Sequence, residues 1–221
     1  MLYRWIFFFV ALFPISAQSE ILPFNLYKNN IEFDVFRDGE KVGHHSTRFK
    51  IRKNSQIIES RMNIEVTVFS IPIYSFTYEA TEIWVNGQMA NLDVLVLDGS
   101  EQKTIKVSSA TDGFSIKSPS GEGMFSEPII STNHWNINVV NDSRVLNTLT
   151  GEINRVKITN KGSERISIKN GTLKATRYDY TGDLKNTSAW YDDEGRWVKL
   201  QFIARDGSTI NYLCNTCDFK Q

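Results

Sequence analysis

Hydrophobic and polar residues alternate over long stretches of the chain. In segment 62–68 every second residue is apolar, and in segment 74–84 the alternating row consists of Tyr74, Phe76, Tyr78, Ala80, Glu82 and Trp84. A period of two is typical of a β-strand that buries one face. The pattern therefore predicts long strands, and it makes one face of the second segment rich in aromatic side chains.

Turn signals separate the alternating segments. Six of the 13 glycines follow an aspartate or asparagine, and such a pair accepts the positive φ angles of a two-residue turn. We expect each pair to join two neighbouring antiparallel strands. The pairs are Asp38-Gly39, Asn86-Gly87, Asp98-Gly99, Asp112-Gly113, Asn170-Gly171 and Asp206-Gly207.

The predicted strands fall into two groups, before and after a central segment. The first group covers residues 31–37, 42–52, 56–69, 74–85, 89–97, 102–109 and 114–117. The second group covers residues 152–160, 164–168, 172–181, 187–191, 197–204 and 209–213. Pro72 interrupts the longest apolar stretch and predicts a bend or an edge between two strands. The central segment, 118–147, opens with a loop and lacks clean alternation, and we expect a short helix near 132–140 within it.

These elements predict an all-β, mainly antiparallel fold. About a dozen long strands do not stay flat, because strand twist accumulates across a sheet. Such a sheet curves into an open or closed barrel, or it folds over as a sandwich. We expect a large curved sheet or open barrel with a short helix and loop insertion near 118–147, and a single β-rich domain over residues 20–221.

The curvature of the sheet bears on function. A strongly curved sheet can hold a ligand on its concave face, whereas a sandwich fills its interior with its own side chains. The candidate ligand-binding residues are aromatic residues of the alternating row and of the insertion, which is expected to act as a lid. They are Tyr74, Phe76, Tyr78, Trp84, Phe125 and Trp135. The competing interpretation is that these residues form an ordinary core.

The first 19 residues have the layout of a secretion signal. Arg4 supplies the positive charge, residues 5–13 form an apolar run, Pro14 ends it, and Ala17-Gln18-Ser19 fits a signal peptidase site. The run is shorter than the about 20 residues that an anchoring helix needs. Cleavage after Ala17 and a first core helix are the alternatives. We expect a signal peptide over 1–19 and a soluble, exported mature protein, periplasmic or secreted, that does not span the membrane.

Composition and charge exclude one class of partner. The chain has 25 basic and 25 acidic residues, and removal of Arg4 with the signal leaves a net charge of −1. Nucleic-acid binding needs a basic surplus to neutralise phosphates, so we expect no nucleic-acid partner. A domain of this size buries enough surface to fold without a metal ion or a disulfide.

The two cysteines, Cys214 and Cys217, follow the last predicted strand closely. In an exported chain a local disulfide is the simplest interpretation. A redox-active pair needs the N-terminus of a helix to lower a thiol pKa, and this position does not offer one. Redox exchange, metal binding and free thiols remain the alternatives.

The three histidines lack the spacing of a metal site. His44 and His45 are adjacent on a predicted strand and point to opposite faces, so we expect one to face the core and the other the solvent. His134 lies in the insertion, where a packing or helix-start role is favoured over catalysis. The sequence assigns no catalytic residue, no metal ligand and no cofactor.

A series of short motifs runs along nearly the whole mature chain. The motifs are Phe33-Asp34-Val35, Asp38-Gly39, Val42-Gly43-His44, Tyr78, Glu82-Ile83-Trp84, His134-Trp135-Asn136, Leu146-Asn147-Thr148, Gly151-Glu152, Tyr178, Trp190-Tyr191, Gly195, Asp206-Gly207 and Tyr212. In order and spacing they are similar to an exported bacterial family known as domain of unknown function 6134. The resemblance implies an exported β-rich protein of unassigned activity, with a distant likeness to curved-sheet lipid and lipoprotein carriers of the cell envelope. It implies no catalytic residue.

Two classes of function remain open, and a third class is less favoured. The first is a binding protein for an apolar or amphipathic molecule such as a lipid. The second is a structural or interaction module that binds another envelope protein, and the third is a hydrolase without a linear motif. An apolar cavity of roughly 300 Å³ or more would favour the first class, and a solid interior would favour the second.

Overall fold

The computed structural model describes residues 26–27 and 30–217. The expected signal peptide over residues 1–19 lies outside the described residues. None of the helices within the described ranges is long and apolar enough to span a membrane.

Within the described residues, fourteen strands form one antiparallel sheet, in the order β8-β7-β6-β5-β4-β3-β2-β1-β14-β13-β12-β11-β10-β9. The strands of the first half are β1 (Asn30–Arg37), β2 (Glu40–Arg52), β3 (Ser55–Val68), β4 (Ile71–Val85), β5 (Gln88–Asp98), β6 (Glu101–Ala110), β7 (Gly113–Ser118) and β8 (Gly121–Phe125). Those of the second half are β9 (Arg144–Leu146), β10 (Ile153–Ile168), β11 (Gly171–Gly182), β12 (Thr187–Tyr191), β13 (Trp197–Ile203) and β14 (Thr209–Cys214). The two halves are joined where β1 pairs with β14, with Phe33 opposite Cys214.

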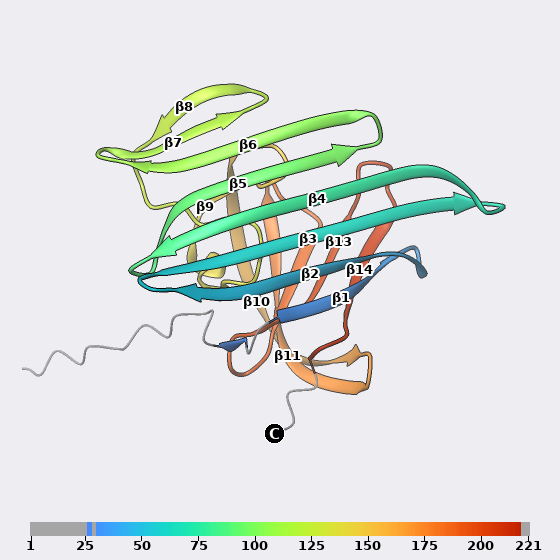
Figure 1. The fold of residues 1–221 in the computed structure, drawn as a ribbon. Helices are drawn as coiled ribbons and strands as arrows, with labels where there is room; N and C mark the ends of the chain where they lie inside the picture. The colour runs from blue at the N-terminus through green and yellow to red at the C-terminus, as the bar shows by residue number, and fades with distance from the viewer. Residues whose placement is uncertain (1–25, 28–29, 218–221) are drawn as a thin grey trace, which may run out of the picture.

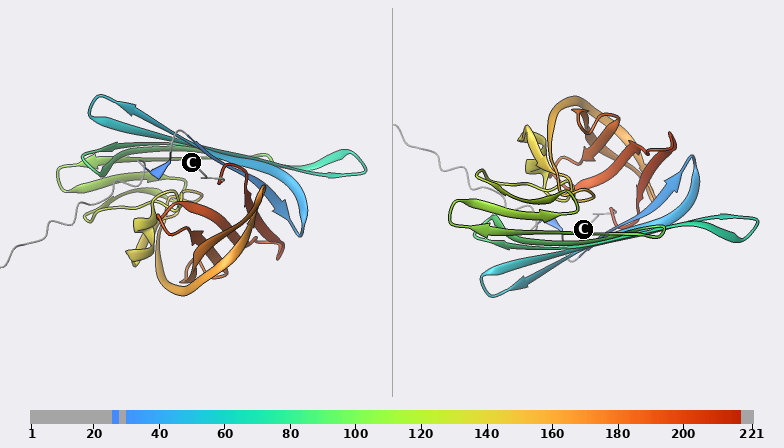
Figure 2. Two further views of the ribbon diagram at one scale, coloured as in Figure 1. Left: turned by 90° about the horizontal axis from the view of Figure 1, so that it is seen from below. Right: turned by 90° about the horizontal axis from the view of Figure 1, so that it is seen from above.

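The sheet is strongly curved and stays open. Strands β1–β8 form a broad layer, and strands β10–β14 turn back across one side of it (Figures 1 and 2). In the described part of the chain the terminal strands β8 and β9 each have one partner strand, so the sheet does not close. The predicted all-β, curved and open sheet is confirmed.

The hydrophobic core lies between the two halves of the sheet. Phe33 on β1 and Trp197 on β13 are both buried, and their ring centroids are 4.4 Å apart. Leu92 on β5 and Ile105 on β6 extend the same cluster toward the other end of the broad layer. Burial of alternate side chains on the strands therefore holds the two halves together, as the period of two predicts.

All six aspartate-glycine and asparagine-glycine pairs lie at the connections of neighbouring antiparallel strands, either between the strands or at a strand end, as predicted. At Asp38-Gly39 the φ angles are 49° and 90°, and at Asn86-Gly87 they are 51° and 77°. Two consecutive positive φ angles define the turn type whose twist matches that of the flanking strands.

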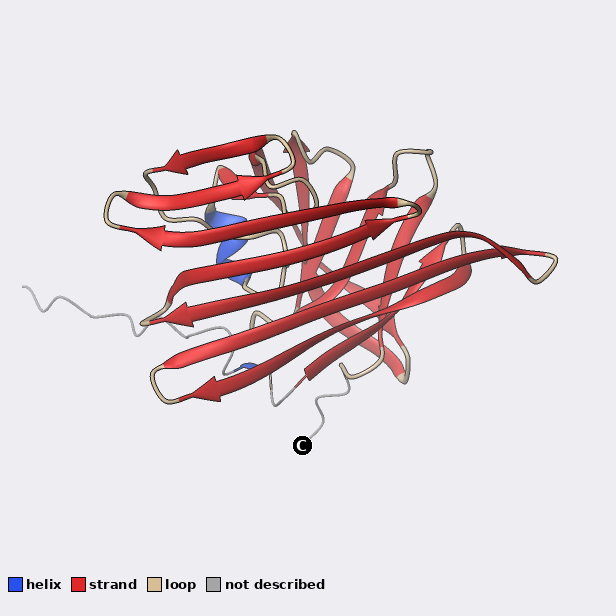
Figure 3. Cartoon of the chain, turned by 45° about the horizontal axis from the view of Figure 1, so that its top comes forward, coloured by secondary structure: helices blue, strands red, loops and turns tan. Residues whose placement is uncertain are grey.

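The segment 118–147 differs in detail from its prediction. Residues 121–125 form strand β8, which the sequence pattern did not reveal because its glycines provide no alternation. The expected helix near 132–140 is replaced by a short 3-10 helix, η2 (Ile137–Asn141), shown in Figure 3. His134 has a φ of 57°, which is incompatible with an earlier helix start, and the Asn136 side chain accepts a hydrogen bond from the backbone N–H of Asn138.

The two strands predicted over 152–160 and 164–168 form the single strand β10. Its register with β11 shifts between Asn160 and Ser163, and Gly162 has a φ of 88° there. The sequence break is therefore a β-bulge within one strand, a position that favours glycine.

The hairpin of β3 and β4 projects beyond its neighbours (Figure 1). Pairing of β3 with β2 ends at Ile64, and pairing of β4 with β5 ends at Phe76. We call residues 66–74 the β3–β4 tip. Pro72 is the second residue of β4 and lies in this projecting part, where its missing N–H interrupts no pairing with β5.

Candidate functional site

A cavity of about 180 Å³ lies between the two halves of the sheet and is partly open to solvent. We call it the interlayer cavity. Strands β2, β3 and β4 contribute lining residues from one half of the sheet, and strands β12, β13 and β14 contribute them from the other. Residues 132–134 of the insertion and residues 147–149 also line the cavity. Its apolar lining includes Met62, Leu200 and Phe202, and its polar lining includes His45, Tyr78, Asn133, His134 and Tyr212.

His45 is the most unusual group of the interlayer cavity. Its side chain is buried, with 5% of the residue exposed, and its Nε2 lies 3.3 Å from the hydroxyl of Thr47. That hydroxyl is in turn 3.1 Å from the hydroxyl of Ser60. The Nδ1 of His45 is buried and has no hydrogen-bond partner among the described residues. Burial lowers the pKa of His45 to about 3, so its imidazole is neutral at physiological pH.

His134 enters the same cavity from the insertion. The Tyr180 hydroxyl lies 3.4 Å from its Nδ1, and the Tyr191 hydroxyl donates a hydrogen bond of 2.9 Å to its backbone carbonyl. Burial lowers the pKa of His134 to about 4, so this imidazole is also neutral. The expected packing role fits this position, because two tyrosines of the second half of the sheet hold the residue in place.

A buried carboxylate ties the insertion to β4. The Oε2 of Glu82 accepts hydrogen bonds from the indole N–H groups of Trp84 and Trp135, at 2.7 Å and 3.3 Å. Its Oε1 accepts from the hydroxyl of Ser131, at 2.8 Å, and from the side-chain amide of Asn133. All four bonds use the oxygens as acceptors, as an ionised carboxylate does. These bonds compensate for the desolvation of a fully buried carboxylate.

The Glu82 network also reaches the interlayer cavity. The Tyr78 hydroxyl donates a hydrogen bond of 2.5 Å to the Oδ1 of Asn133, which is itself bonded to Glu82. Sequence reasoning missed the roles of Glu82 and Asn133. The signal available for Glu82 was its position among Tyr78, Ala80 and Trp84 on the buried face of a strand, where an acidic residue is exceptional.

A second cavity, of about 200 Å³, lies on the other side of this network. It is lined by Trp84, Met89, Phe114, Ile130 and Trp135, among others. The rings of Trp84 and Trp135 meet edge to face, with centroids 5.3 Å apart. The two cavities are each smaller than the roughly 300 Å³ at which ligand pockets usually begin.

A comparison with models of protein families shows to which family the chain belongs. Residues 33–215 match the model of the family described as Domain of unknown function (DUF6134). The chain belongs to this family. The sequence resemblance is thereby confirmed, and the family description assigns no activity.

A search of solved structures gives a likeness in fold. A crystal structure of a beta-barrel-like protein of Domain of Unknown Function DUF1849 from Brucella abortus matches with a TM-score of 0.59. The match covers 84% of this chain and 94% of that chain, at 7% sequence identity. At that identity the likeness concerns the fold alone. No curated protein matches the chain.

The six predicted ligand-binding residues of this DUF6134 chain do not come together at one site. Tyr78 lines the interlayer cavity, whereas Trp84 and Trp135 line the second cavity. Phe76 and Phe125 pack against the core from its margin. Tyr74 is 40% exposed, and its hydroxyl donates a hydrogen bond of 2.8 Å to Asp98. The aromatic row is therefore buried toward the end of β4 and exposed toward its start.

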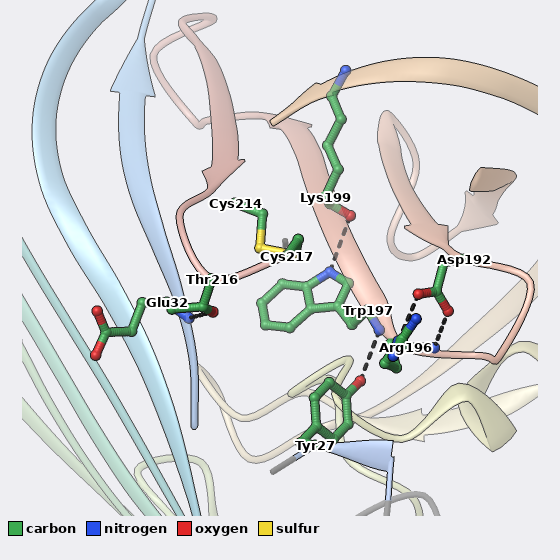
Figure 4. Close-up of a disulfide and its surroundings, with 9 residues drawn as sticks. All are labelled: Tyr27, Glu32, Asp192, Arg196, Trp197, Lys199, Cys214, Thr216 and Cys217. Atoms are coloured by element: carbon green, nitrogen blue, oxygen red, sulfur yellow. Dashed lines mark hydrogen bonds and ion pairs between the residues drawn. A yellow bond between two sulfur atoms is a disulfide. The ribbon is translucent and has the colours of Figure 1, made fainter. Parts of the chain in front are cut away.

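The sulfur atoms of Cys214 and Cys217 lie at disulfide-bonding distance, with 5.6 Å between the Cα atoms (Figure 4). Both residues are buried, and the intervening Thr216 accepts a hydrogen bond of 3.0 Å from the backbone N–H of Glu32. The segment between the two cysteines is thus hydrogen-bonded to β1 just after the end of β14. Within the described ranges, no group of three or more histidine, cysteine, aspartate or glutamate residues is arranged to hold a metal ion.

Proposed function

We propose that the mature protein is exported and binds an amphipathic molecule in the interlayer cavity. The observation that carries the proposal is the unpartnered Nδ1 of His45, a buried polar atom of a residue that lines the cavity. The leader-like layout of residues 1–19 and the cysteine pair support export.

The unpartnered nitrogen favours the binding of a ligand that carries a polar group. A buried donor or acceptor without a partner costs about 1–3 kcal/mol of free energy. A ligand that brings a hydrogen-bonding group to His45 recovers this cost. Met62, Leu200 and Phe202 then contact the hydrocarbon part of the same ligand, and burial of apolar surface adds to the binding free energy.

The cavity is smaller than the roughly 300 Å³ expected of a ligand-binding protein, and its size limits what it holds. At about 180 Å³ it accommodates the polar end of a ligand and the adjoining carbon atoms, and not a whole lipid. The remainder of a longer hydrocarbon chain would leave through the side that is open to solvent. This geometry fits an amphipathic ligand better than a fully enclosed apolar one.

The test is ligand binding by the natively purified mature chain. We expect lipid mass spectrometry to find a co-purifying amphipathic molecule, and we expect saturable fluorescence titration with fatty-acyl and fatty-alcohol probes. Phe202→Ala should weaken probe binding about tenfold. Phe76→Ala is the matched control, because it removes another partly buried phenylalanine that does not line the cavity. No co-purifying molecule and no saturable binding by the folded protein would overturn the proposal.

A second candidate function is supported by the β3–β4 tip. Phe69, at its apex, is 96% exposed, and the tip also exposes Ile71 and Ile73. Phe69 has a φ of 50° and Ser70 a φ of 65°, although the comparable turn at residues 86–87 uses asparagine and glycine. A positive φ is unfavourable for a bulky residue such as phenylalanine. Phe69 at this position therefore indicates a role other than stabilising the fold. An interaction module that inserts Phe69 into another envelope protein is the alternative that a negative binding result would favour.

A further inference from the structure

We infer that the interlayer cavity selects ligands whose polar group is uncharged, such as a hydroxyl or a neutral carbonyl group, over carboxylates, phosphates and amines. The inference rests on the proposed binding function and names the chemical class of the ligand.

The first argument is the chemistry of the lining. Among the described residues that line the interlayer cavity there is no lysine, arginine, aspartate or glutamate. Its polar groups are hydroxyls, side-chain amides and two imidazoles, which are neutral at physiological pH. A charged group that entered this site would lose water without gaining a counterion, and the cost of such a transfer is several kcal/mol.

The second argument is the charge behind the lining. The Glu82 carboxylate is connected to the cavity through Asn133, which accepts the hydrogen bond of Tyr78. A negative charge at this position repels an anionic ligand. The same charge attracts a cationic group, but Glu82 does not line the cavity, so an amine that entered it would form no direct ion pair with this carboxylate.

The third argument is the hydrogen-bonding capacity of His45. Its Nε2 is next to the Thr47 hydroxyl, which can donate or accept, so the Nδ1 is either an acceptor or a donor. A ligand hydroxyl that reaches the Nδ1 satisfies it in both cases. A neutral carbonyl satisfies it when the Nδ1 carries the proton. A carboxylate could accept from the same N–H, but its charge would remain without compensation.

The experiment compares three ligands that share one hydrocarbon chain. Decanol, decanoate and decylamine are titrated into the mature protein at about pH 7.5, where the carboxyl and the amine are charged. We expect decanol to bind at least about tenfold more tightly than either charged ligand. Decanoate or decylamine binding as tightly as decanol would overturn this inference and leave the binding function intact. Binding of none of the three would instead contradict the binding function.

Variants of the two adjacent histidines identify the group responsible. His45→Phe should reduce the affinity for decanol about tenfold and remove most of its advantage over decanoate. His44→Phe should leave both affinities unchanged, because His44 lies on the opposite face of β2 and does not line the cavity. An unchanged preference in folded His45→Phe would contradict the assigned role of His45.

The wild-type protein offers a readout that does not depend on the folding of a variant. Decanol should change the imidazole ¹⁵N chemical shift of the His45 Nδ1 on binding, since this nitrogen gains a hydrogen bond. The corresponding shifts of His44 should not change. Saturable decanol binding without any change at His45 would also overturn the inference.

Discussion

His45 and His134 are both buried, at a place where no acidic group of the described residues offers an imidazolium a counterion. His44, the neighbour of His45, is partly exposed and lies 3.9 Å from the carboxylate of Asp34. The opposite orientation of the two adjacent histidines follows from the alternation of a strand, and the sequence predicted it. The unpartnered Nδ1 could not be predicted, because it depends on which residues the second half of the sheet brings to the cavity.

The buried histidines make stability depend on pH. Burial lowers their pKa values to about 3 and about 4, from the 6.5 of an unfolded histidine. The unfolded chain therefore binds more protons below pH 6.5. The stabilising contribution is complete well above this value and is lost as the pH falls from 6.5 toward about 4 for His134 and about 3 for His45. Each histidine contributes a slope of at most about 1.4 kcal/mol per pH unit.

We expect urea unfolding to show a lower free energy of unfolding at about pH 5 than at about pH 7.5. His45→Gln should reduce this difference, and His44→Gln should not. The aspartates with lowered pKa values, Asp34, Asp179 and Asp206, act only below about pH 4 and do not affect this interval. Equal stability at the two pH values would contradict the assignment of both histidines as buried neutral groups.

At the scale of elements, alternation and turn chemistry identified most of the strands. They failed where glycines remove the pattern, as in β8, and where a bulge divides it, as at Gly162 in β10. The insertion was recognised by its lack of alternation, but its internal structure was not predicted. Its contacts are long-range, and the hydrogen bond from Ser131 to Glu82 joins residues 49 positions apart.

The turn of the β3–β4 tip provides a prediction about a single element. Phe69 and Asn86 occupy turns with nearly equal positive φ angles, 50° and 51°. Phe69→Asn should stabilise the protein by about 0.5–1 kcal/mol, because asparagine tolerates this conformation better than phenylalanine. Asn86→Phe should destabilise it by a similar amount. The measurement is the urea midpoint of each variant, and a clear loss of stability in Phe69→Asn would show that Phe69 serves the fold.

At the scale of the whole molecule, the pairing of β1 with β14 brings the two halves of the sheet together and creates the interlayer cavity. Residues 33 and 214 are register partners although they lie near opposite ends of the chain. Local patterns do not predict such a pairing, so the sequence could indicate a curved sheet but not the composition of its interior. The predicted aromatic residues are consequently divided between two cavities, the margin of the core and the surface.

A crystal structure of the mature protein with a decanol brominated at the end of its chain tests the central claim most directly. The account predicts the hydroxyl oxygen within hydrogen-bonding distance of the His45 Nδ1. It also predicts anomalous signal from bromine at the side of the interlayer cavity that is open to solvent. A bound alcohol whose hydroxyl points away from His45, or one that occupies only the cavity between Trp84 and Trp135, would contradict the account.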